Sequence, residues 1–248
     1  MEKVFTKEAL SVILILAAII VKSFSRAYPR QEFGILLIYF TLYLSAIITA
    51  SLTFWNNAWI LLLSGALIGS ISEFIGTRTG VPFGLYYYQE LKPQVFGVPV
   101  LVPIAWGTFL FLSYLTASSM FRGFKAVLMA STLMVIIDLA LDPVMTSWKA
   151  WVWVTKTDVN WYGIPWTNYL GWFVVSLISL MSYGFAARKL EFKETRALKA
   201  MPGLYLLEMF IFYALAAQET AEPTLYALLV AIIAIVAGLA LRSYEKKR

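Results

Sequence analysis

Long apolar runs dominate this chain and limit what it can fold into. A helix that spans a bilayer needs about 20 mostly apolar residues, and eight runs approach that length. They lie approximately at residues 8–24, 33–54, 58–76, 98–121, 124–145, 167–188, 202–217 and 223–242. Hydrophobic residues fill 60% of the 248 positions and charged residues 14%, whereas soluble domains have about 45–50% and about 25%. The sequence excludes a soluble globule and predicts a single all-α polytopic membrane domain over residues 1–248.

The basic residues predict how this domain is oriented. The net charge of +6 comes from short loops and the C-terminus rather than from one stripe, so it indicates membrane orientation rather than nucleic-acid binding. With eight spans, the loops on the side of the N-terminus collect 13 of the 20 basic residues, namely Lys3, Lys7, Arg122, Lys125, Arg188, Lys189, Lys193, Arg196, Lys199, Arg242, Lys246, Lys247 and Arg248. We therefore expect an integral cell-membrane protein with both termini cytoplasmic. The first apolar run lacks a small-residue cleavage site and is interpreted as a retained helix.

The missing residue types narrow the chemistry. The chain has no histidine and no cysteine, which excludes a Ser-His-Asp triad, a cysteine nucleophile and thiolate metal sites. If the protein is an enzyme that moves protons, carboxyl groups must do the work.

Four acidic residues fall within the expected spans: Glu73, Asp138, Asp142 and Glu208. Ionisable groups in a bilayer are costly and usually mark function. Glu73, Asp138 and Asp142 lie at similar depth, and the i,i+4 spacing of the two aspartates puts them on one helical face. Like charges in a low dielectric cannot all ionise, so at least one of the three carboxyls is expected to hold a proton. Ion pairs with Arg78 and Lys149 are the structural alternative, and Glu208 fits a hydrogen bond to a neighbouring helix equally well.

Two long loops, near residues 77–97 and 146–166, adjoin these acids. The second contains five of the nine tryptophans: Trp148, Trp151, Trp153, Trp161 and Trp166. An interfacial aromatic belt is one explanation, and rings that line a cavity and stabilise a cation are another. Pro143, directly after Asp142, favours a break or kink in that helix.

The chain also contains an internal repeat. Residues 97–106 and 163–172 share Gly, Pro and Trp at equal offsets, and the same shift of 66 residues (163 minus 97) maps Glu73 next to Asp138. This predicts two related helical hairpins, helices 3–4 and 5–6, around a shared intramembrane acidic pocket. The motif-bearing core is about residues 58–188, and Asn168 adds an amide to the pocket.

Several of these motifs together resemble the membrane carotenoid 1,2-hydratases, which include enzymes acting on γ-carotene-like ends and the archaeal bisanhydrobacterioruberin hydratases. The similarity covers roughly residues 30–190. It is carried by the segments Glu73–Gly80, Pro82–Tyr87, Gly97–Pro99 with Pro103 and Trp106, Asp138–Pro143, and Gly163–Pro165 with Asn168 and Trp172.

The resemblance implies a hydro-lyase of carotenoid biosynthesis that adds water to the terminal C1=C2 bond of an acyclic end group, without a redox cofactor or metal. A protonated carboxyl would make a tertiary carbocation, and a water held by a carboxylate would capture it. The expected catalytic residues are Glu73, Asp138 and Asp142, with acid and base unassigned. Expected substrate contacts are Asn168, Arg78, Tyr86, Trp106, Trp148, Trp166 and Trp172. Expected partners are a long apolar carotenoid, membrane lipid and other enzymes of carotenoid biosynthesis, with no nucleic acid.

Other functions compete with hydration. A lycopene-cyclase-like enzyme would use the same carbocation but capture it with an internal alkene. A prenyltransferase is suggested by the Asp138 and Asp142 spacing, although those enzymes use paired acidic motifs to hold Mg²⁺. A proton-coupled transporter would need a water path to the cytoplasmic side, and a structural scaffold would leave the acids unexplained.

Overall fold

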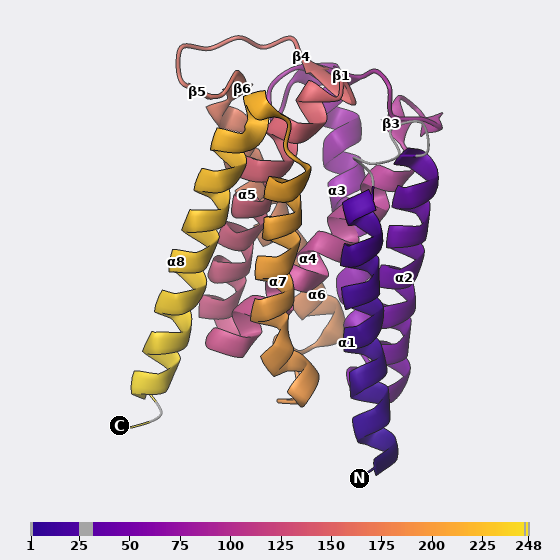
Figure 1. Ribbon diagram of the computed structural model, residues 1–248, viewed down its shortest axis with the longest axis vertical. Coiled ribbons are helices and arrows are strands. Elements are labelled where there is room, and N and C mark those ends of the chain that lie inside the picture. Colours follow the sequence, from indigo (N-terminus) through magenta and orange to yellow (C-terminus); the bar gives the residue numbers. More distant parts are fainter. Residues whose placement is uncertain (1, 25–31, 246, 248) are drawn as a thin grey trace.

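The computed structural model describes residues 2–24, 32–245 and 247. Arg26, Arg30, Lys246 and Arg248, which entered the charge count, lie outside the described residues. The described part contains eight α-helices, and the expected all-α polytopic fold is confirmed (Figure 1). They are α1 (Glu2–Ser23), α2 (Glu32–Thr53), α3 (Ala58–Thr79), α4 (Leu101–Met120), α5 (Gly123–Ser147), α6 (Trp166–Ala187), α7 (Arg196–Leu215) and α8 (Ala221–Glu245).

The helices form a bundle whose two ends differ. Short strands and loops cover one end, and the start of α1 and the end of α8 lie at the other (Figure 1). Within the described residues, seven helices, α2 to α8, are long and apolar enough to cross a membrane. Helix α1, whose sequence includes Lys7, Glu8 and Lys22, is not among these seven. It packs along α2 and α7.

The repeat seen in the sequence is also present in the backbone. Helices α3 and α4 form one hairpin, α5 and α6 form the other, and α3 packs on α6 as α4 packs on α5. Each hairpin contains a small antiparallel strand pair, β2 (Gln94–Val95) with β3 (Val98–Pro99) and β5 (Asn160–Trp161) with β6 (Ile164–Pro165). Gln94 pairs with Pro99 and Asn160 with Pro165, so the registers match at the 66-residue shift.

The two tight turns explain why the repeat retains glycine. Phe96 and Gly97 have φ of 51° and 78°, and Tyr162 and Gly163 have φ of 50° and 86°. Two-residue hairpin turns with positive φ at both positions match the twist of the strands and favour glycine at the second position. Gly97 and Gly163 are therefore set by backbone geometry rather than by contact with a ligand.

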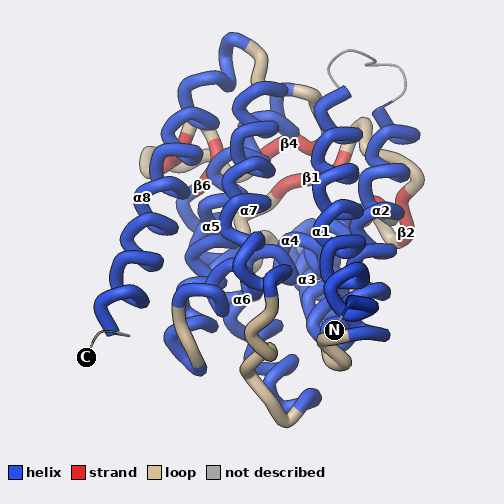
Figure 2. The backbone as a smooth tube through the Cα atoms, turned by 60° about the horizontal axis from the view of Figure 1, so that its bottom comes forward, coloured by secondary structure: helices blue, strands red, loops and turns tan. Residues whose placement is uncertain are grey.

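A third strand pair joins the two long loops. Strand β1 (Tyr86–Tyr88) runs antiparallel to β4 (Trp151–Trp153), with Tyr86 opposite Trp153 and Tyr88 opposite Trp151. The pair lies across the strand-bearing end of the helix bundle (Figure 2). The sequence did not predict this pairing, which turns the aromatic side chains of the two loops into a fixed cover over the carboxyl groups.

Helix α5 continues through Pro143 to Ser147, so of the break or kink expected after Asp142 the break does not occur. Proline lacks the N–H that would bond to the carbonyl four residues earlier, which here belongs to Leu139. The Trp161 indole of the second loop donates to that oxygen at 3.1 Å. The Trp161 side chain thus replaces the missing backbone donor to Leu139, and the helix continues past Asp142 for another turn.

Candidate active site

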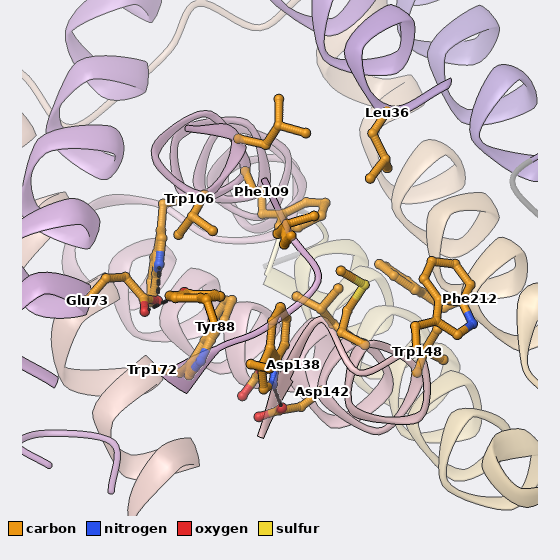
Figure 3. Close-up of a pocket in the computed structure, with 18 of the residues that line it drawn as sticks. Leu36, Glu73, Tyr88, Trp106, Phe109, Asp138, Asp142, Trp148, Trp172 and Phe212 are labelled. Atoms are coloured by element: carbon orange, nitrogen blue, oxygen red, sulfur yellow. Dashed lines mark hydrogen bonds between the residues drawn. The ribbon is translucent and has the colours of Figure 1, made fainter. Parts of the chain in front are cut away.

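One large cavity opens among the helices below the β1–β4 cover. It contains about 980 Å³ of space between atoms, its open mouth included. Eight of the ten residues expected at the site line it: Glu73, Tyr86, Trp106, Asp138, Asp142, Trp148, Asn168 and Trp172. Figure 3 labels Glu73, Trp106, Asp138, Asp142, Trp148 and Trp172 among them. Tyr88, Trp151 and Trp153 join them. The two related hairpins therefore bring their acidic and aromatic residues to one cavity.

Glu73 is held by three donors from the first hairpin. Its Oε1 accepts from the Trp106 indole at 2.8 Å, and its Oε2 accepts from the hydroxyls of Tyr86 and, at 2.7 Å, Tyr88. Trp106 can reach this carboxyl because Gly69, which has no side chain, lies one turn before Glu73 on α3. A Cβ at Gly69 would lie 2.3 Å from the Trp106 ring, so the indole packs directly on the helix backbone.

The tyrosines on β1 remain donors. Burial, followed by the nearby Glu73 carboxylate, raises the pKa of both Tyr86 and Tyr88 well above the ordinary value. Their hydroxyls thus keep their protons at neutral pH and stabilise charge on Glu73.

The second hairpin holds the aspartate pair and an amide. Asn168 on α6 donates from Nδ2 to Asp138 Oδ2 at 2.5 Å and to Asp142 Oδ2 at 2.7 Å. Asp142 Oδ1 also accepts from the indoles of Trp151 at 2.5 Å and Trp153 at 3.2 Å. Among the described residues Asp138 Oδ1 has no hydrogen-bond partner, although the side chain is 0% exposed.

Aromatic rings surround these carboxyls. Trp106 comes from the first hairpin and Trp172 from the second, and their rings stack with centroids 4.2 Å apart. Tyr86 lies 4.8 Å from Trp153, and Tyr88 lies 5.8 Å from Trp151, across the strand pair. The negative faces of such rings can stabilise a cation.

Two expected site residues lie elsewhere. The Arg78 guanidinium donates to the carbonyls of Phe74 and Phe96 and stacks on the Phe74 ring, 3.6 Å from its centroid. Trp166 is 60% exposed and does not line the cavity. The alternative pairing of Glu73 with Arg78 is not seen either, since the three donors already described occupy Glu73.

Sequence reasoning did not assign Tyr88, Trp151 and Trp153 to the site, although the two tryptophans were noted in the second aromatic loop. Their bonds to Glu73 and Asp142 depend on how the two loops pair, which no periodicity indicates. It also missed Lys22, which forms an ion pair with Glu208 across the bundle. A lysine near the end of an apolar run resembles an ordinary flanking charge.

The fold and the cavity together define a polytopic membrane protein with a buried acid–amide cluster at one end of an apolar chamber. The chain belongs to the family of carotenoid biosynthesis proteins, which it matches over residues 32–237. A bisanhydrobacterioruberin hydratase from Haloarcula japonica is 30% identical over 120 residues, a match that covers 46% of this chain and 40% of that protein. No solved structure matches the chain.

Proposed function

We propose that this protein hydrates the terminal C1=C2 double bond of an acyclic carotenoid end group. The observation that carries the proposal is the cluster of three buried carboxyls and one amide in an apolar, ring-lined cavity of a carotenoid biosynthesis protein. An alkene is a very weak base, so it needs a strong, dry acid and a site that tolerates a carbocation. The name of the partial relative, a hydratase, supports water as the group that captures the cation.

Asp138 is the acid in this proposal. The other carboxyl oxygens of the cluster each accept from at least one donor, whereas Asp138 Oδ1 has none among the described residues. A buried anionic oxygen without a donor is costly, and a proton on that oxygen removes the cost. The proton then sits on the one carboxyl oxygen that is not already accepting a hydrogen bond.

Asp142 is the base. Indoles can only donate, and two of them, with the Asn168 amide, bond to its oxygens. These donors stabilise the ionised form. Glu73 accepts from three donors in the same way. Its role is to stabilise the carbocation by its negative charge and not to donate a proton.

The reaction balances within the aspartate pair. Asp138 gives its proton to C2, the π electrons form the new C2–H bond, and C1 becomes a tertiary cation. Water forms the C1–O bond and passes one proton to Asp142. Transfer of that proton from Asp142 to Asp138 restores both carboxyls, so the net change is the addition of one water.

The proposed place in the membrane follows from the charge bias. With both termini cytoplasmic, the strand-bearing end and the cavity lie toward the outer face. A long apolar substrate would reach the cavity from the lipid phase, and other enzymes of carotenoid biosynthesis would supply it.

Pigment analysis tests the function directly. The protein is expressed in bacteria that accumulate acyclic carotenoids, with and without oxygen substituents, and the extracts are analysed by chromatography and mass spectrometry. We expect products heavier by one or two water molecules. Ring-containing isomers of unchanged mass would instead support the cyclase, and unchanged pigments despite protein in the membrane would contradict both.

A further inference from the structure

The two sides of the cavity differ in exposure. Figure 3 shows Glu73 and Trp172 on one side, and it shows Leu36, Trp148 and Phe212 on the other. Glu73 and Trp172 are buried, at 5% and 8% exposed. Leu36 and Trp148 are partly exposed. The side of the cavity that is open to the surroundings is therefore the one far from Glu73.

Three separate helix ends surround this exposed side. Leu36 comes from the first turns of α2, Met145 and Trp148 come from the end of α5 and the residue after it, and Leu215 is the last residue of α7. Within the described residues, α2 makes no extended contact with α5 or α7. Helix α1 packs on both α2 and α7, but it ends at Ser23, below the level at which α2 begins in Figure 1. Apolar side chains, rather than packed helices, thus form this wall of the cavity.

The depth of the cavity limits how much of a substrate it can hold. The α4 residues that line it run from Leu101 to Phe109, which corresponds to about 12 Å along a helix. A cavity of this depth encloses an end group and the isoprene units next to it. The rest of a long carotenoid must then lie outside the cavity, in the lipid, while the end group reaches the carboxyls.

We infer that the substrate chain leaves the cavity through a passage formed by Leu36 of α2, Trp148 after α5 and Leu215 of α7. This inference rests on the proposed function and adds the direction in which the substrate lies, with its end group at the aspartates and its chain passing out between α2, α5 and α7. The passage suits a hydrocarbon chain because its three side chains offer apolar surface, whose burial is favourable without any hydrogen bond. These residues therefore select substrates by the size of the chain that must pass them.

The test compares two ligands that share the terminal C1=C2 bond. One is a full-length acyclic carotenoid, and the other is a truncated acyclic polyene short enough to lie within the cavity. Leu36→Trp narrows the passage. Leu67→Trp is the matched control, because Leu67 is 61% exposed on α3 and does not line the cavity. Each variant carries one additional tryptophan, so their fluorescence signals are comparable.

Binding to the full chain in lipid nanodiscs is measured by quenching of tryptophan fluorescence, and hydration is measured separately by mass spectrometry. Leu36→Trp should bind the full-length carotenoid at least about tenfold more weakly than the wild type and Leu67→Trp, because an added ring obstructs a packed passage. All three proteins should bind the truncated polyene with similar affinity. Leu215→Trp changes the α7 side of the passage and should show the same selective loss.

Unchanged affinity of both passage variants for the full-length carotenoid would overturn the inference. An equal loss for the two ligands, in protein shown to be folded by its thermal unfolding, would overturn it as well, since a passage acts only on the chain that extends through it. Selective loss of binding, together with a wild type that hydrates neither ligand, would support the passage and contradict only the hydratase function.

Discussion

At the scale of single residues, the hydrogen-bond donors make three similar carboxyls different. Glu73 and Asp142 each accept from several groups, whereas Asp138 accepts from Asn168 alone within the part of the chain that the structure describes. The sequence predicts that Glu73, Asp138 and Asp142 share a site, because their depth and helical spacing are readable. It does not distinguish them, because the distinguishing donors come from the folded loops.

The Trp151 indole is expected to matter through its N–H rather than its ring. Trp151→Phe keeps an aromatic ring but removes the 2.5 Å hydrogen bond to Asp142. A hydrogen bond to a charged group contributes about 1.5–3 kcal/mol, so the hydration rate should fall about 10- to 100-fold. Trp59→Phe is the control, since Trp59 lies half-exposed on α3 and outside the cavity. Equal rates in the two variants, measured per folded protein, would argue against Asp142 as the base.

At the scale of helices and loops, the apolar runs predict the eight helices to within a few residues. The main boundary differences are the start of α1 at Glu2 rather than near residue 8 and the start of α7 at Arg196 rather than near residue 202. Strands β1 and β4 were not predicted, because three-residue strands joined through distant loops leave no local signal. Of the break or kink expected at Pro143, the break does not occur, since Trp161 supplies a donor that local sequence cannot reveal. Long-range partners, not local propensity, account for both differences.

The close packing of α3 on α4 gives a prediction about stability and site geometry. In Gly69→Ala the new methyl would overlap the Trp106 ring, which should lower the free energy of unfolding by about 1–3 kcal/mol and displace the donor to Glu73. Gly203→Ala is the matched control, because a Cβ there meets no atom within 4 Å; it should be neutral or stabilising by about 0.5–1 kcal/mol. Thermal unfolding in detergent, followed by tryptophan fluorescence, measures both. A Gly69→Ala protein as stable as wild type would show that the contact is not tight.

At the scale of the whole molecule, the two hairpins place the cavity at the strand-bearing end, and the orientation that we propose from the charge bias would put that end outside the cell. The absence of cysteine from the sequence makes this orientation easy to test. Asp158→Cys introduces a thiol in the exposed loop between β4 and β5, and Lys193→Cys introduces one in the exposed loop between α6 and α7. In intact cells a membrane-impermeant maleimide should label position 158 alone, and position 193 should react only after permeabilisation. The reverse pattern would place the site toward the cytoplasm.

The most direct test of the acid and base roles follows solvent deuterium. Purified protein is incubated with substrate in D₂O, and both product and recovered substrate are analysed by mass spectrometry and NMR. The wild type should yield an alcohol with one deuterium at C2. Asp142→Asn should form little alcohol but return alkene deuterated at C2, because Asp138 still protonates the double bond and takes a proton back. Asp138→Asn should lose both reactions, by about 10²–10⁴-fold. Deuterium uptake that survives in Asp138→Asn, in protein shown to be folded, would contradict Asp138 as the proton donor.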